Sequence, residues 1–120
     1  GVNWEAMMSA VKYQLGRLIV FVDHNGFQSG DAVKEISGLL PIQPKWESFG
    51  WHTQVINGHD MEAINEAVTN AKSVQDIPSV IIAKTVKGKG VSFMENDNAW
   101  HKGVPTKDQL KQAIQELEAV

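Results

Sequence analysis

Cysteine is absent from the sequence of 120 residues, which excludes disulfide bonds, catalytic thiolates and metal sites built on thiolates. No apolar run approaches the roughly 20 residues that a membrane-spanning helix needs. No signal peptide is recognisable at the N-terminus. We therefore expect a cytoplasmic protein that has no membrane partner.

A strong excess of charge is also missing, since the formal net charge is −3 at pH 7. Such a balance gives no reason to expect a nucleic-acid partner. The chain has no internal repeat and no low-complexity tract, and its 42% hydrophobic and 21% charged residues are ordinary for a globular domain. Its length is sufficient for one domain with a core of its own.

The signatures of several common catalytic sites are missing as well. The sequence contains neither the close Ser/His/Asp grouping of a hydrolase nor the spacing of a zinc site built from protein ligands alone. Its segment rich in lysine and glycine, residues 84–90, does not match the Walker motif, because the spacing differs and no Ser or Thr follows the lysine. The chemistry is therefore to be sought in other loops.

Apolar residues recur with helical spacing in four segments, which predicts helices over residues 4–15, over 44–49, after Asp60 and after Thr106. Asn3 is a candidate N-cap and Gly16 a candidate stop for the first helix. Asp60 can cap the third helix, and Gln109 completes a capping box with Thr106. The faces expected to point inward are Trp4, Met8, Val11 and Leu15 in the first helix, Met61, Ile64, Ala67, Val68 and Ala71 in the third, and Leu110, Ile114 and Leu117 in the last.

Three short apolar runs are interpreted as strands, at residues 18–22, 51–56 and 80–83. The first run does not alternate with polar residues, which is typical of a strand covered on both faces of a parallel sheet. Alternating strands and helices predict an α/β fold, a parallel sheet with helices on both faces. Ligands of such sheets bind beyond the carboxyl ends of the strands, so the long loops after the first and third strands are the candidate sites.

The first of these loops begins with Asp23-His24-Asn25-Gly26-Phe27-Gln28, and one helical turn is expected farther on, near Val33 to Ile36. The amide oxygen of Asn25 and the backbone carbonyl of Phe27 are hard donors that suit Mg²⁺. The loop is therefore a candidate for holding a metal and a diphosphate. A plain Asn-Gly turn would have the same sequence, and the residues alone leave both interpretations open.

The second loop runs from residue 84 to residue 105 and contains Lys84, Lys87 and Lys89 beside Gly88 and Gly90. Lysine charges and exposed backbone N–H groups could cradle a phosphate. His101, which follows Trp100, could donate a hydrogen bond to phosphate or move a substrate proton. The alternatives are a solvated loop and a structural histidine.

Taken together, these residues resemble the thiamine diphosphate-binding part of transketolases. The resemblance rests on six segments in the same order, "WEA" at 4–6, "LIVFVDHNGFQ" at 18–28, "KWESFGWH" at 45–52, "NGHD" at 57–60, "IIAKTVKGKGVSFMEN" at 81–96 and "WHKGVP" at 100–105. It covers nearly the whole chain and is strongest to the separate N-terminal subunit of split transketolases. It implies that residues 1–120 are the C-terminal portion of a thiamine diphosphate-binding domain of the diphosphate type.

The resemblance implies roles for individual residues. Asn25 matches the asparagine whose side chain binds Mg²⁺, Phe27 the residue whose carbonyl also binds it, and Gly26 lies between them in the cofactor-binding turn. His101 matches a histidine that reaches the cofactor diphosphate and the substrate side of the cleft, and so is the candidate catalytic residue. Val86 falls where an apolar residue packs near the cofactor.

The sequence departs from the family pattern at three places. The Gly-Asp-Gly start of the metal motif is absent, and Gly1 would be a glycine of the segment that follows it, so we expect a fragment with an incomplete metal site. Ser29-Gly30-Asp31 shortens the turn after the metal ligands. Lys102 stands between His101 and Gly103, whereas in the family pattern the glycine follows the histidine directly.

The implied activity is transfer of a two-carbon ketol unit from a ketose to an aldose, with thiamine diphosphate and Mg²⁺, in the carbohydrate metabolism of the pentose phosphate pathway. The glutamate that activates the cofactor would come from a C-terminal subunit or domain, so a hetero-oligomer or dimer is implied, with phosphorylated sugars as substrates. The open alternatives are an enzyme like 1-deoxyxylulose-5-phosphate synthase or a 2-oxoacid dehydrogenase E1 component, and a non-catalytic assembly domain that lost the cofactor site.

Overall fold

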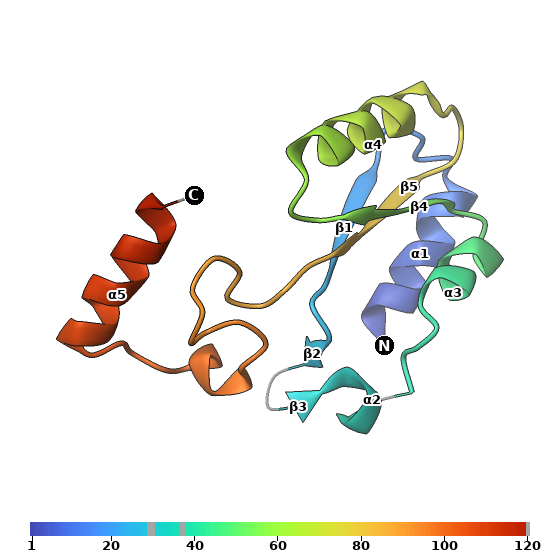
Figure 1. The fold of residues 1–120 in the computed structure, drawn as a ribbon. Coiled ribbons are helices and arrows are strands. Elements are labelled where there is room, and N and C mark those ends of the chain that lie inside the picture. The colour runs from blue at the N-terminus through green and yellow to red at the C-terminus, as the bar shows by residue number, and fades with distance from the viewer. Residues whose placement is uncertain (29–30, 37, 120) are drawn as a thin grey trace. The chain divides into compact units, whose positions relative to one another are not determined.

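The computed structural model describes residues 1–28, 31–36 and 38–119, and these form two compact units (Figure 1). The first unit combines Gly1–His24 with Leu39–Lys84, and the second combines Asn25–Gly38 with Thr85–Val120. None of the described helices is long and apolar enough to cross a membrane.

A parallel sheet is the centre of the first unit. Its strands are β1 (Ile19–His24), β4 (His52–Asn57) and β5 (Ser79–Lys84), in the order β1-β5-β4. The central strand β5 is buried from Ser79 to Ala83, as expected for an unbroken apolar run that is covered on both faces. The prediction of a parallel α/β sheet is therefore confirmed.

The prediction for the first strand is wrong in two respects. β1 does not end at Val22 but continues through Asp23 and His24, which lie in register with Ala83 and Lys84 of β5. It is also not covered on both faces, because the side chain of Phe21 is 49% exposed. The strand order explains both differences, since β1 lies at an edge of this sheet and its polar end is held by backbone pairing with β5.

Helices cover both faces of this sheet (Figure 1). On one face, α1 (Val2–Lys12) and α3 (Gln43–Ser48) contribute to a core cluster that consists of Met7, Ala10, Trp46, Trp51, Val80 and Ile82. The indole N–H of Trp51 donates a hydrogen bond to the Met7 carbonyl at 3.1 Å, which satisfies a buried polar atom. On the other face, Gln54 Nε2 of β4 donates to the Ala67 carbonyl of α4 (Met61–Ser73) at 2.9 Å.

The buried stripe of α1 differs from the predicted one. Met8 is 53% and Leu15 45% exposed, whereas Met7 and Ala10 are buried. Trp4 and Val11 do pack against the core, so the stripe passes through positions 4, 7 and 11. Leu15 lies beyond the helix because α1 ends at Lys12, and its N-cap is Gly1 rather than Asn3. In α4 the predicted Ala67 and Ala71 are buried, but Met61 in the first turn is 71% exposed.

Asp60 caps α4 as predicted. Its Oδ1 atom accepts hydrogen bonds from the backbone N–H groups of Glu62 at 2.9 Å and Ala63 at 3.1 Å. Replacing Asp60 with alanine removes these acceptors and should lower the free energy of unfolding by about 1 kcal/mol, measured by urea denaturation. Asp60→Asn keeps an oxygen acceptor and should cost much less; equal losses in the two variants would contradict the capping role.

The second unit contains short elements and one longer helix. The strands β2 (Phe27–Gln28) and β3 (Asp31–Ala32) pair antiparallel, and α2 (Val33–Ile36) is the predicted helical turn. Ser29 and Gly30, on which the prediction of a shortened turn depends, lie outside the described residues. A 3₁₀ helix, η1 (Asn98–His101), precedes α5 (Lys107–Glu118).

Helix α5 begins with the predicted capping box, in which Thr106 and Gln109 bond each other's backbone N–H groups. Its predicted inward face is wrong, because Leu110, Ile114 and Leu117 are 50%, 46% and 55% exposed and Ala113 is the buried residue. The side of α5 that meets the rest of its unit carries the buried Ala113 and Glu116, which bonds Ser92, and hydrophobic spacing does not reveal such a polar contact.

Candidate functional site

The turn at Asn25-Gly26 follows β1 directly and is held by two hydrogen bonds. The amide oxygen of Asn25 accepts from the backbone N–H of Phe27 at 2.9 Å, and the Gly26 carbonyl accepts from the N–H of Val33 at 2.9 Å. Gly26 has a φ of +84°, a conformation that glycine adopts without steric cost. The turn therefore fixes the direction of the Asn25 side chain.

The oxygen atoms of this turn are of the type that binds a magnesium ion. The Asn25 amide oxygen and the Phe27 carbonyl are hard, neutral donors, and Mg²⁺ prefers oxygen ligands in octahedral geometry together with water and phosphate. Within residues 1–28, 31–36 and 38–119, no group of three or more His, Asp or Glu side chains gathers into a metal cage. A metal at this turn would therefore need further ligands from phosphate and from other protein segments.

The glycine loop, residues 85–96, closes on itself. The N–H of Asn96 donates to the Lys87 carbonyl at 2.9 Å, and that of Val91 donates to the Gly88 carbonyl at 3.2 Å. Gly88 and Gly90 have φ values of +73° and +94°. A methyl group on Gly88 would overlap with the carbonyl of Met94, so this position requires glycine both for its φ and for its close contact.

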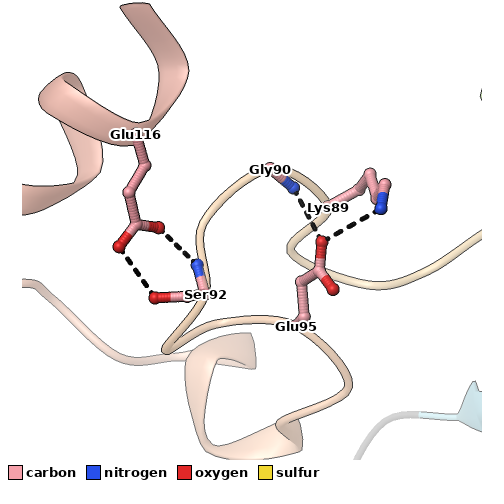
Figure 2. A network of polar contacts seen from close by, with 5 residues as sticks. All are labelled: Lys89, Gly90, Ser92, Glu95 and Glu116. Carbon is pink, nitrogen blue, oxygen red and sulfur yellow. Dashed lines mark hydrogen bonds and ion pairs between the residues drawn. The ribbon is translucent and has the colours of Figure 1, made fainter. Parts of the chain in front are cut away.

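The lysines beside these glycines do not form a uniform phosphate cradle. Lys89 pairs with Glu95 at 3.3 Å, and the same carboxylate accepts from the N–H of Gly90 at 3.1 Å, so part of this charge stabilises the loop itself (Figure 2). Lys84 ends β5 in the first unit, and Lys87 is half-buried in the glycine loop. Lysines that are near one another in the sequence thus have different surroundings in the structure.

His101 is the last residue of η1 and is exposed. The segment that carries it is anchored through its neighbour Trp100, whose indole N–H donates to the Phe93 carbonyl at 2.8 Å and whose ring packs edge-on against the Phe93 ring. Asp97 caps η1 by accepting from the N–H of Ala99 at 2.9 Å. The structure thus ties His101 to the glycine loop, while Asn25, Gly26 and Phe27 lie together in their own turn of the same unit.

A contact between the glycine loop and α5 was missed from the sequence (Figure 2). Glu116 accepts two hydrogen bonds from Ser92, one from its backbone N–H at 2.6 Å and one from its hydroxyl at 2.7 Å. Gln112 donates to the same carboxylate at 2.7 Å. The bond from the Ser92 backbone, followed by those from Gln112 and the Ser92 hydroxyl, lowers the pKa of Glu116. The spacing of Gln112 and Glu116 along one helix was the only sequence signal available.

A cleft of about 730 Å³ in the first unit has no residue of these loops in its lining. It is lined by residues that precede β1 and β5, among them Arg17 and Asp76, and by Lys72 near the end of α4. This is the amino end of the parallel strands, opposite the end at which such sheets bind ligands. The cleft therefore does not compete with the loops as the candidate site.

Comparison with known proteins shows the family to which the chain belongs. The family model described as "Transketolase, thiamine diphosphate binding domain" matches residues 1–118. The 6-deoxy-6-sulfo-D-fructose transketolase subunit SqwG of Clostridium sp. is 44% identical over 118 residues, which are 98% of this chain and 43% of that protein. An apulose-4-phosphate transketolase subunit of Phocaeicola vulgatus is 35% identical over 98% of this chain and 42% of its own length.

The fold has solved counterparts in the same family. The crystal structure of transketolase from Campylobacter jejuni superposes with a TM-score of 0.86 at 30% identity, covering 98% of this chain and 18% of that one. The chain thus spans less than half the length of the curated subunits that it matches, and a smaller part of the larger transketolases.

Proposed function

Because the chain belongs to the family of transketolase thiamine diphosphate-binding domains, we propose that it forms part of the cofactor site of a transketolase. The enzyme would transfer a two-carbon ketol unit from a ketose to an aldose. The relatives are named as transketolases or their subunits, which favours this activity over that of a 1-deoxyxylulose-5-phosphate synthase or a 2-oxoacid dehydrogenase.

The observation that carries the proposal is the geometry of the turn after β1. Asn25 is held by the N–H of Phe27 in a turn that Gly26 makes possible, so a side-chain oxygen and a backbone carbonyl are presented from adjacent positions. In our proposal these two oxygens bind Mg²⁺, which in turn holds the diphosphate of the cofactor. The glycine loop and the anchored histidine segment belong to the same unit as this turn, which supports a shared role in binding.

Each part of the site has a proposed task. Asn25 and Phe27 bind the metal, and Gly26 lets the backbone turn close to the diphosphate. The glycine loop packs against the cofactor through Val86, and the exposed ring of His101 donates a hydrogen bond to the diphosphate or to substrate oxygen. Thiamine diphosphate, when bound, supplies the nucleophilic carbon that receives the ketol unit.

The proposed site is completed by other polypeptide. Two neutral oxygens leave the charge of Mg²⁺ to be balanced by diphosphate and by an acidic ligand outside these residues. Because several relatives are named as subunits, we propose a C-terminal partner subunit that provides the activating glutamate. Phosphorylated sugars as substrates, a cytoplasmic location and a place in the pentose phosphate pathway belong to the same proposal and are supported by family membership.

Binding of the cofactor tests this proposal. The complete protein, purified together with its partner subunit, is titrated with thiamine diphosphate in a calorimeter, with Mg²⁺ and with excess chelator. We expect saturable binding that depends on the metal, together with ketol transfer between sugar phosphates. Absence of metal-dependent binding in the complete assembly would refute the proposal, and binding without transfer to any aldose would favour the non-catalytic assembly domain.

A further inference from the structure

The glycine loop is fastened by two carboxylates that come from different places. Glu95 belongs to the loop and accepts from the N–H of Gly90, whereas Glu116 belongs to α5 and accepts from Ser92 (Figure 2). Ser92 is 24 positions from Glu116 in the sequence, so this second contact joins separate segments. The loop therefore does not depend on its own hydrogen bonds alone.

The contact from α5 is well defined because both partners are held. Ser92 donates through its backbone N–H and its hydroxyl, one to each carboxylate oxygen, which fixes the backbone at this residue as well as the side chain. Gln112, one helical turn before Glu116, donates to the carboxylate and restricts its rotation. Hydrogen bonds to an ionised acceptor are stronger than those between neutral groups.

The same end of α5 contacts the loop at a second point. A methyl group on Gly90 would come within 3.0 Å of Leu117 Cδ2, so this leucine lies directly over the glycine. Val91, between Gly90 and Ser92, is buried with 7% exposure. Gly90 and Ser92 are thus both constrained by α5, and the residue between them is buried.

We propose that Glu116 is a positioning residue for the cofactor, because it holds the glycine loop in the conformation that binds thiamine diphosphate. This inference rests on the proposed function, in which the loop packs against the cofactor. Glu116 itself is not a cofactor ligand in this proposal and acts through Ser92. If the contact is removed, the free loop samples more conformations. Part of the binding free energy must then offset the conformational entropy that is lost when the cofactor orders the loop.

The proposal predicts a change in affinity rather than in the chemical step. A cofactor that is bound at saturating concentration restores the loop, so kcat should be retained within about twofold. The apparent dissociation constant should rise about fivefold in Glu116→Ala, which is modest because the carboxylate lies near solvent and backbone bonds within the loop remain. Glu116→Gln keeps an acceptor oxygen and should fall between the wild type and the alanine variant.

The experiment uses the complete protein with its partner subunit. Thiamine diphosphate is titrated at saturating Mg²⁺, and hydrogen exchange of the segment 85–96 is followed without cofactor. Glu118→Ala is the matched control, because Glu118 is exposed on the same helix, two positions on. Ser92→Ala should weaken binding, Ser92→Thr should restore it, and a variant with both Ser92→Ala and Glu116→Ala should be little worse than Glu116→Ala alone.

The outcomes separate the two proposals. Faster exchange and weaker binding in Glu116→Ala, with wild-type values in Glu118→Ala, would support the positioning role. Equal affinity in these two variants, while the wild type binds cofactor normally, would overturn the role of Glu116 and leave the proposed function intact. Failure of the wild type to bind thiamine diphosphate would instead overturn the proposed function.

Discussion

Replacement of Asn25 with alanine is expected to weaken the binding of Mg²⁺ and thiamine diphosphate by on the order of 100-fold or more. The substitution removes the one side-chain oxygen that this turn offers to the metal, and it also removes the hydrogen bond that the N–H of Phe27 donates. The metal then loses a ligand, and the carbonyl of Phe27 loses part of the support that directs it. Calorimetric titration of the complete protein with its partner subunit measures the effect.

The chain contains a matched control for this substitution. Asn57-Gly58 is a second Asn-Gly turn at the end of a parallel strand, and there too the Asn side-chain oxygen accepts from a backbone N–H two residues on, that of His59 at 3.1 Å. Asn57→Ala removes the same turn chemistry at the end of β4, a different strand from β1, which precedes the proposed metal ligands. Its cofactor affinity should stay within about twofold of the wild type, because only a turn hydrogen bond is lost. Equal affinities of the two variants would refute the assignment of Asn25 to the metal.

Asn25→Asp distinguishes a role of Asn25 as a metal ligand from a structural role in the turn. Aspartate keeps an oxygen in the same place and adds a negative charge, so binding of the cation should survive, whereas alanine abolishes the ligand. If aspartate were as harmful as alanine and thermal stability also fell, a structural role of the turn would explain both results.

Replacement of Gly88 with alanine should destabilise the glycine loop by about 3 kcal/mol or more. A side chain at a φ of +73° costs roughly 1–2 kcal/mol, and the added methyl group would also overlap with the Met94 carbonyl. Because that neighbour is backbone, the overlap is relieved only by moving the loop. We expect the backbone amides of residues 85–96 to lose their protection from hydrogen exchange. Cofactor binding should be lost at any practical concentration.

Gly50→Ala separates the cost of backbone strain at positive φ from the cost of steric overlap. Gly50 has a φ of +85°, but a methyl group there would meet Val11 Cγ1 at 3.5 Å, an ordinary van der Waals distance. This variant should therefore show the backbone strain alone, about 1–2 kcal/mol in urea denaturation, with cofactor affinity unchanged. A loss of stability no larger in Gly88→Ala than in Gly50→Ala would contradict the crowding at Gly88.

The parallel sheet was predicted from the alternation of strands and helices along the chain, and the other features that sequence predicted correctly depend on chemistry within a few residues. The cap at Asp60 and the capping box of Thr106 and Gln109 are of this kind, and so is the Asn-Gly turn at the candidate site. The end of β1 could not be found in this way. The local sequence predicts that Asp23 and His24 are loop residues. They lie in a strand because they pair with β5, about 60 positions later.

The same distinction applies to the candidate site. Asn25, Gly26 and Phe27 were identified together because one turn contains them. The bond from Ser92 to Glu116 joins a loop to a distant helix, and no local pattern marks a helix glutamate as the partner of a loop serine. The anchoring of Trp100 on Phe93 was likewise missed, because ring contacts depend on how the loop folds.

The strand order β1-β5-β4 has a consequence for the newly made chain. Within the described residues both β1 and β4 pair with β5, which is the last of the three to leave the ribosome. Until residue 84 has been synthesised, the segments of β1 and β4 lack the strand with which they pair, and unpaired strand segments can associate with other chains. This sheet cannot form without its central strand, so we expect a chain truncated before Ser79 to be prone to aggregation.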